Sequence, residues 1–183
     1  MDAVSAAFAA WPREGFLPRS QRRRAAYDGP LEIGRGQTNS QPRTVSAMLR
    51  LLDVRPGQRV LDVGAGSGWS TALLAYLTGP SGVVTGVELE PDLVASGGDN
   101  LAATGQSWAS IRVASPDVLG LPDDAPWDRI LVSAAPPALP SSLVSQLTDD
   151  GVMVIPVAGT MLRVTNPGAT VTRHGGYRFV PLR

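Results

Sequence analysis

Alternating apolar and polar stretches in residues 60–155 predict a sheet layered with helices. Short apolar runs of strand type occur at 60–63, 83–88, 111–114, 129–133 and 151–155. Stretches of helical character separate several of them, at 70–77, 92–103 and 141–147. Because strands that alternate with helices form right-handed parallel crossovers, we predict an α/β fold with a mostly parallel sheet and helices on both faces.

The two ends of the chain depart from this central pattern. Before it we expect a short helix at 4–11, an irregular charged stretch at 13–30, and an amphipathic helix that starts at Pro42 and continues to Leu52. After it, short strand-like segments at 162–165, 170–173 and 177–180 are divided by glycine and proline turns. We expect these segments to add an antiparallel hairpin to one edge, for a sheet of seven strands.

A glycine turn follows the first strand of the central pattern. Residues 59–68 read R-V-L-D-V-G-A-G-S-G, with Asp62 inside the strand and glycines at Gly64, Gly66 and Gly68. A strand, a tight turn and a helix N-terminus present backbone N–H groups and a positive dipole end to a ligand. The G-x-G-x-G spacing resembles motif I of the class I S-adenosyl-L-methionine (AdoMet) methyltransferases. The resemblance implies the Rossmann-like fold of that class. A turn that only packs a helix on a strand is the alternative.

The second strand of the pattern ends in an acid, Glu88, about 20 residues after the glycines. Acids at this place commonly accept hydrogen bonds from ribose hydroxyls, and Glu88 is the candidate for the ribose of AdoMet. A solvated strand end is the alternative. Because ligands of open α/β sheets lie beyond the carboxyl ends of the strands, we expect the glycine turn, Glu88 and the segment around Asp117 to form one site.

Composition excludes several other classes of function. The 183 residues carry no net charge and are 43% apolar, which favours a single folded domain and gives no reason to expect nucleic acid or a membrane surface as partner. Cysteine is absent and His174 is the single histidine, so we expect no disulfide, no metal site and no Ser-His-Asp triad. With no apolar run near 20 residues, we expect a cytoplasmic protein.

Three further segments carry a resemblance to a known family. They read W-P-R-E-G-F-L-P at 11–18, P-L-E-I-G-R-G-Q-T-N-S-Q-P at 30–42, and R-F-V-P-L at 178–182. Together with the glycine turn and Glu88, they are similar to the protein-L-isoaspartate O-methyltransferases over nearly the whole chain. The second segment, close to P-L-P-I-G-x-G-Q-T-I-S-x-P in the family, is the most diagnostic.

The resemblance implies a single methyltransferase domain over residues 1–183, with an N-terminal extension (1–44) that contributes to the site. It implies methyl transfer from AdoMet to the free carboxylate of isoaspartyl residues in peptides or proteins, as a step of protein repair, by a cytoplasmic enzyme that we expect to be monomeric. Ser40 and Thr38 are the candidate catalytic residues. The candidate cofactor-binding residues are Gln37, Asp62, Gly64, Gly66, Gly68, Glu88 and Asp117. A carboxylate acceptor has a reference pKa of about 3.9, so it is already a nucleophile at neutral pH and needs no strong base.

Departures from the family pattern cluster on the acceptor side. Asn39 stands where the family has Ile, and Arg43 where it has His or Tyr, so both are candidate substrate-binding residues. For Arg43, a solvated residue in the first turn of the helix is the alternative. Pro116 takes the place of the family's adenine-contacting Asp, which leaves Asp117 as the candidate for that contact. Two alternative functions follow: a carboxyl methyltransferase for one dedicated peptide, and a non-catalytic AdoMet-binding module. Ser40 has an alternative role as the cap of the helix that starts at Pro42.

Overall fold

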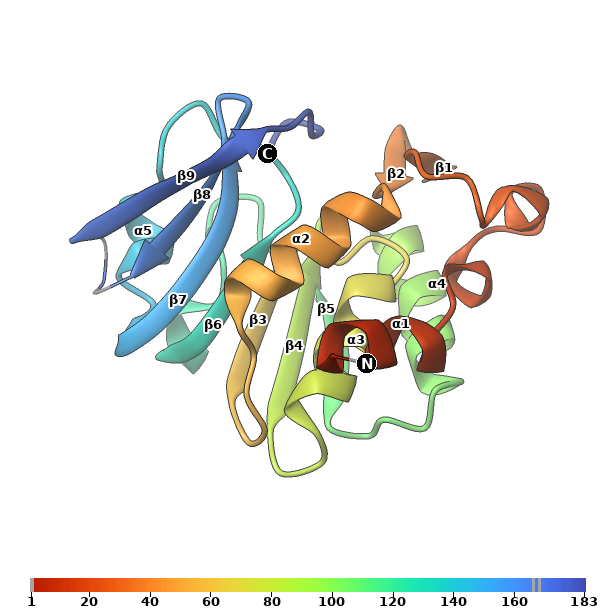
Figure 1. Ribbon diagram of the computed structural model, residues 1–183, viewed down its shortest axis with the longest axis horizontal. Coiled ribbons are helices and arrows are strands. Elements are labelled where there is room, and N and C mark those ends of the chain that lie inside the picture. Colours follow the sequence, from red (N-terminus) through yellow and green to blue (C-terminus); the bar gives the residue numbers. More distant parts are fainter. Residues whose placement is uncertain (1, 166, 168) are drawn as a thin grey trace.

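A seven-stranded sheet forms the centre of the computed structural model, which describes residues 2–165, 167 and 169–183 (Figure 1). In chain order its strands are β3 (Arg59–Val63), β4 (Val83–Glu88), β5 (Ala109–Val113), β6 (Trp127–Val132), β7 (Leu147–Val157), β8 (Thr160–Thr165) and β9 (Thr170–Gly176). Their spatial order is β5-β4-β3-β6-β7-β8-β9. Neighbouring strands from β5 to β7 are parallel, whereas β8 runs antiparallel to β7 and β9. The predicted α/β class, the mostly parallel sheet and the antiparallel C-terminal hairpin are confirmed.

Helices cover the two faces of the sheet unequally. One face carries α1 (Ala3–Ala10), α2 (Pro42–Leu52), α3 (Trp69–Thr78) and α4 (Pro91–Ala102), and in Figure 1 α2 lies across this face in orange. The other face is covered by the short α5 (Ser141–Val144) and by apolar residues of the connection 114–125. Within the described residues, no helix combines the length and hydrophobicity that crossing a bilayer requires.

The pleat of the central strands divides the core into two layers. Val60 and Leu131 point into the layer under α1 to α3, while Leu61, Ile130 and Val132 point into the layer on the opposite face. Such strands are apolar on both sides because parallel sheets bury both faces. This burial explains why the apolar runs of the sequence predicted the strands of the sheet interior.

The N-terminal segment contains more structure than the sequence indicated. Within and just after the stretch expected to be irregular lie two 3-10 turns, Arg13–Phe16 and Arg22–Arg24, and a hairpin of β1 (Leu31–Gly34) with β2 (Gln37–Asn39). A third 3-10 turn, Pro122–Asp124, precedes β6. The β1–β2 hairpin was not predicted, because its strands are too short and too polar to show a two-residue alternation.

Two of the elements expected near the C-terminus are wrong: one is shorter than expected and the other does not form. The helix expected at 141–147 ends at Val144, because Leu147 already pairs with Trp127 at the start of β7. The strand expected at 177–180 does not form. Instead, the Ala135 N–H donates to the carbonyl oxygen of Val180 (2.8 Å) and the Leu182 N–H to that of Ala135 (3.1 Å). These bonds turn the last residues towards the carboxyl ends of the central strands.

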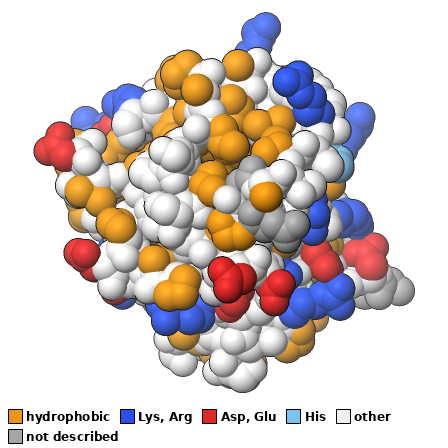
Figure 2. All heavy atoms as spheres, turned by 90° about the vertical axis from the view of Figure 1, so that its left-hand side faces the viewer, with side chains coloured by type: hydrophobic (Ala, Val, Ile, Leu, Met, Phe, Trp, Pro, Cys, Tyr) orange, Lys and Arg blue, Asp and Glu red, His pale blue; other side chains and the backbone are white. Residues whose placement is uncertain are grey.

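Figure 2 shows the end of the molecule at which β9 forms the edge of the sheet. Hydrophobic side chains gather in its upper part, and both acidic and basic side chains lie around them. Val171 of β9 is among the exposed large hydrophobic residues. Charges of both signs on this face agree with the zero net charge of the chain.

Candidate active site

A cavity of about 320 Å³ opens at the carboxyl ends of β3, β4 and β6. The glycine turn follows β3, Glu88 ends β4, and Ser133 follows β6, and all three contribute to its wall. From β3 the chain proceeds outward through β4 to β5 and then returns to place β6 on the other side of β3. The cavity therefore lies where the strand order reverses, which is the usual ligand position in open α/β sheets.

The three glycines of the turn have different roles. All have positive φ angles, of 83° at Gly64, 53° at Gly66 and 84° at Gly68, which favour glycine because it has no Cβ. Gly64 and Gly66 line the cavity. Gly68 is the N-cap of α3 and does not line it; a Cβ there would lie 2.7 Å from the carbonyl oxygen of Gly97 in α4. Gly68 thus allows α3 and α4 to approach each other.

Glu88 is buried at the cavity wall, with 8% of its surface exposed, so it is not a solvated strand end. Its Oε2 accepts a hydrogen bond from the Gly66 N–H (3.0 Å) and its Oε1 from the Glu90 N–H (3.1 Å). The carboxylate therefore holds the glycine turn in place. Because an ionised carboxylate has about four acceptor positions, it can also accept bonds from ligand hydroxyls.

Asp62 lies beneath the turn and does not line the cavity. It is fully buried, and its Oδ2 accepts hydrogen bonds from the hydroxyls of Ser70 (2.7 Å) and Thr71 (2.8 Å), while its Oδ1 has no partner among the described residues. Burial raises the pKa of Asp62 to about 6, and the charge of Glu88 adds to the increase. Since Ser70 lines the cavity, Asp62 acts on the site by orienting this hydroxyl.

Replacing Asp62 by asparagine is expected to change how stability depends on pH. The pKa in the folded protein lies above the unfolded value of 3.8, so the folded protein binds the proton first as the pH falls. Ionisation of the Asp62 carboxyl therefore lowers the free energy of unfolding of the wild type by about 2 kcal/mol as the pH rises from 4 to 7. Urea unfolding of both proteins from pH 4 to 7 measures this loss as a change in the difference between their free energies of unfolding. A difference that does not vary with pH would contradict the prediction.

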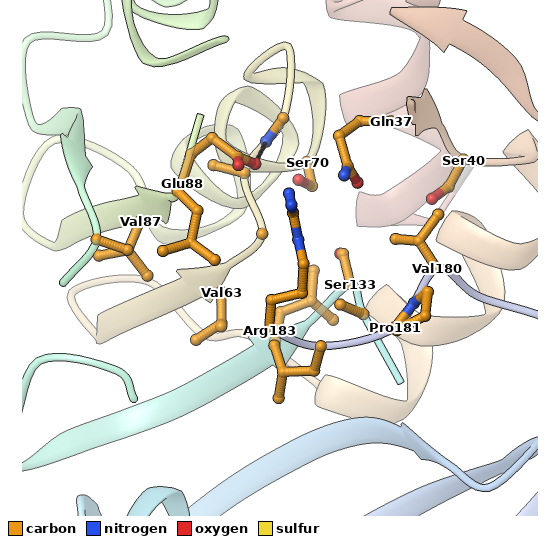
Figure 3. A pocket seen from close by; sticks show the side chains of 18 of the residues that line it. Gln37, Ser40, Val63, Ser70, Val87, Glu88, Ser133, Val180, Pro181 and Arg183 are labelled. Atoms are coloured by element: carbon orange, nitrogen blue, oxygen red, sulfur yellow. Dashed lines mark hydrogen bonds between the residues drawn. The ribbon is translucent and has the colours of Figure 1, made fainter. Parts of the chain in front are cut away.

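The opposite wall of the cavity comes from the N-terminal segment. Gln37, Thr38 and Asn39 of β2 and the following Ser40 line it, and Figure 3 shows Gln37 and Ser40 across the cavity from Glu88. Among the described residues, no hydrogen bond involves the Ser40 hydroxyl, which leaves it available to a ligand. Ser40 does not cap α2. Gln41 is the N-cap residue, and Asp28 accepts a bond from the Arg43 N–H (3.1 Å).

Most of the predicted site residues meet at this cavity. Those that line it are Gln37, Thr38, Asn39, Ser40, Gly64, Gly66, Glu88 and Asp117. Asp62 and Gly68 support it from behind. Arg43 lies elsewhere, because its exposed side chain forms an ion pair with Asp28 at 2.9 Å. Asp117 belongs to the exposed segment after β5, on the β4 side of the cavity.

Five polar residues of the cavity wall were not among the predicted site residues: Ser67, Ser70, Ser115, Ser133 and Arg183. Arg183 forms an ion pair with Glu90 at 2.6 Å, and Figure 3 shows its side chain extending into the cavity. Among the described residues that line the cavity, it carries the one positive charge, compared with the negative charges of Glu88 and Asp117. Its place depends on the turn of the chain at Ala135, which no local pattern indicates.

Comparisons with known proteins agree with this arrangement. The family model described as protein-L-isoaspartate(D-aspartate) O-methyltransferase matches residues 1–183. The protein-L-isoaspartate O-methyltransferase of Methanopyrus kandleri is 45% identical over 178 residues, covering 93% of this chain and 79% of its own length. That of Methanocella arvoryzae is 44% identical, with 93% of each chain covered.

A solved structure is similar over the whole chain. It is a Plasmodium falciparum protein of the same family name, crystallised in complex with S-adenosyl-L-homocysteine. The TM-score is 0.87 at 25% identity, and the match covers 100% of this chain and 91% of that one. The match of the family model to all 183 residues, together with these relatives, shows that the chain belongs to the protein-L-isoaspartate(D-aspartate) O-methyltransferase family.

Proposed function

We propose that this protein transfers a methyl group from AdoMet to the free carboxylate of isoaspartyl residues in peptides or proteins. One observation carries the proposal: the glycine turn and the buried Glu88 lie on one side of the cavity, and the Ser40 hydroxyl, which has no hydrogen-bond partner among the described residues, lies on the other. The family relatives, named for this reaction, support it.

The residues of the cavity fit AdoMet. Gly64 and Gly66 bring bare backbone to its wall, and Glu88 offers acceptor positions for ribose hydroxyls at the end of β4. Val63, Ala114 and Leu119 supply apolar surface, and Asp117 lies on the same side as the candidate contact for the adenine amine. When bound, AdoMet supplies a methyl group activated by a sulfonium.

The role of the protein in this reaction is to position the acceptor carboxylate, and no strong base is required. An acceptor carboxylate is ionised at neutral pH, so its oxygen can form the new bond to carbon without losing a proton first. We assign the Ser40 hydroxyl to orient this carboxylate, with Thr38 beside it and the apolar wall excluding water. Holding the oxygen in line with the methyl carbon and its leaving sulfur is then the main task of the site.

Two isomeric peptides test the proposal. Labelled AdoMet is incubated with the protein and a peptide that contains one isoaspartyl residue, or with the same peptide containing normal aspartate. We expect labelling of the isoaspartyl peptide alone. Equal labelling would refute isoaspartyl specificity, and absence of labelling, with AdoMet binding intact by calorimetry, would favour a non-catalytic binding module.

A dedicated peptide substrate would give labelling of one protein in a lysate and none of generic isoaspartyl peptides. The two departures that suggested this alternative do not favour it. The Arg43 side chain pairs with Asp28 away from the cavity, and the Asn39 amide bonds to Arg13 and Ser67.

Replacing Ser40 by alanine is expected to lower kcat for the isoaspartyl peptide by about 10- to 100-fold, because a misplaced acceptor reacts slowly. The dissociation constant of AdoMet should stay near the wild-type value, since Ser40 is on the acceptor side. Steady-state kinetics and calorimetry check both. The matched change at Ser107, an exposed serine away from the cavity, should leave kcat unchanged. A wild-type kcat in the Ser40 variant would remove Ser40 from the mechanism.

We further propose that residues 1–183 act as one domain, in which the N-terminal segment completes the site through residues 37–40. A cytoplasmic monomer that acts on peptides or proteins, and not on nucleic acid, is the form we expect. Sedimentation at working concentration would check the oligomeric state.

A further inference from the structure

A buried arginine ties the N-terminal segment to the acceptor side of the cavity. Arg13 is 5% exposed, and its Nε donates to the side-chain Oδ1 of Asn39 at 2.6 Å. Its other nitrogens donate to the backbone carbonyl oxygens of Tyr27 (3.0 Å), Gly29 (2.9 Å) and Asn39 (2.7 Å). Burial lowers the pKa of Arg13 to about 10, so the guanidinium remains charged at neutral pH and its four hydrogen bonds are charge-assisted.

Asn39 extends this hydrogen-bond network to the glycine turn at 64–68. Its side chain is on the cavity wall with 5% of the residue exposed, and its Nδ2 donates to the Ser67 hydroxyl at 2.9 Å. Ser67 belongs to the glycine turn, and its carbonyl oxygen accepts a bond from the Asn100 side chain of α4 (3.0 Å). Of the hydrogen bonds between described residues, the Asn39–Ser67 bond alone joins residues 37–40 to the turn 64–68.

Both polar atoms of the Asn39 side-chain amide therefore have hydrogen-bond partners. Oδ1 accepts from Arg13 and Nδ2 donates to Ser67, which is the pairing that a buried amide requires. The family's Ile at this position could fill space but could make neither bond. In this chain a directional polar link thus connects the strand that precedes Ser40 with the turn that faces the cofactor.

We infer that Asn39 is a positioning residue, which through Arg13 and Ser67 sets the position of the acceptor strand relative to the cofactor turn. The inference rests on the proposed function, because the atoms to be aligned are an acceptor carboxylate on the Ser40 side and a methyl donor on the Ser67 side. The Asn39–Ser67 bond also couples the two sites. Cofactor bound at the turn stabilises residues 37–40 and so strengthens acceptor binding, and acceptor binding strengthens cofactor binding by the same factor.

Three substitutions test this link. Asn39→Leu keeps the side-chain size and removes both hydrogen bonds, whereas Ser67→Ala removes only the bond between strand and turn. Asn39→Asp is the rescue variant, because its carboxylate can accept from Arg13 while the Ser67 hydroxyl rotates to donate to the other oxygen. Ser67→Ala keeps all four hydrogen bonds of Arg13, so it preserves the N-terminal packing if Asn39→Leu folds poorly.

With an isoaspartyl peptide, Asn39→Leu and Ser67→Ala should lower kcat by about 10- to 100-fold, as expected for a misplaced acceptor. The dissociation constant of S-adenosyl-L-homocysteine should change by less than about 3-fold, because both backbone segments remain. Asn39→Asp should stay within about 3-fold of wild-type kcat. The double variant should be no slower than the slower single variant, since both changes break one link. Wild-type kcat in both single variants, with only thermal stability reduced, would overturn the inference.

Hydrogen exchange gives a readout that does not require turnover. In the wild type, S-adenosyl-L-homocysteine should slow exchange of the amides in residues 37–40, and in Ser67→Ala this effect should be lost although the ligand still binds by calorimetry. Equal protection in both proteins would overturn the coupling. If no peptide is methylated by the wild type but this difference in protection is observed, the link is supported and the proposed reaction alone fails.

Discussion

Replacing Glu88 by alanine is expected to raise the dissociation constant of AdoMet by about 10- to 150-fold, the range for loss of hydrogen bonds to a charged group. The carboxylate has two tasks that alanine cannot perform. It accepts bonds from the N–H groups of Gly66 and Glu90, which holds the turn, and it is the proposed acceptor for the ribose hydroxyls. Isothermal calorimetry with AdoMet and with S-adenosyl-L-homocysteine measures the change directly.

Two companion variants separate these tasks from a general effect of lost charge. Asp149→Ala removes an exposed carboxylate of β7 that is not on the cavity wall, and it should leave the dissociation constant unchanged. Glu88→Gln keeps one acceptor oxygen but turns an NH₂ group towards one of the two backbone N–H groups, so an intermediate loss is expected. An AdoMet affinity equal to wild type in Glu88→Ala would refute the ribose role.

Two adjacent glycines of α4 are expected to respond to alanine in opposite directions. A Cβ on Gly97 would lie 2.7 Å from the carbonyl oxygen of Gly66 and 3.1 Å from the Ile111 side chain, whereas a Cβ on Gly98 would meet nothing within 4 Å. Gly97→Ala should therefore lower the free energy of unfolding by about 1–3 kcal/mol through overpacking. Gly98→Ala should raise it by about 0.5–1 kcal/mol, because alanine loses less conformational entropy in a helix.

The Gly97 change should also affect the cavity. Relief of the contact requires α4 or the turn at Gly66 to move, and Gly66 lines the cavity, so AdoMet affinity should fall in Gly97→Ala and remain unchanged in Gly98→Ala. Chemical denaturation and calorimetry on the matched pair test both effects. Equal stability of the two variants would mean that α4 and the turn are not in the close contact described.

The central strands of the sheet were predictable because they are buried on both sides. The runs at 60–63, 83–88 and 129–133 are mainly apolar, and the glycine turn and the acid that follow or end the first two fall at one edge in any parallel sheet. The β1–β2 hairpin and the path of residues 177–183 were not predictable in the same way. The hairpin strands are too short and too polar to show a two-residue alternation. The path of residues 177–183 depends on contacts between segments far apart in the chain, because Ala135 bonds to Val180 and Leu182.

The same distinction between local sequence and tertiary contacts applies to the candidate site. Spacing alone selected Gly64, Gly66 and Glu88, which the structure places on the cavity wall, because backbone conformation and strand ends are local properties. Asp62 and Gly68 were also selected by spacing, but the structure places them behind the cavity, where they hold the N-terminus of α3 and its approach to α4. Spacing within a motif does not distinguish the side chains that face a ligand from those that support the turn.

On its own, the sequence determined the α/β class, the glycine turn, the acid that ends β4 and the family of the chain, since each follows from residue patterns within short segments and from the order of those segments along the chain. Only the tertiary structure decided that Asn39 bonds to Arg13 and Ser67, that Arg43 turns away to Asp28, and that Arg183 lines the cavity. Long polar side chains can reach several partners, and which partner is near depends on how distant segments pack.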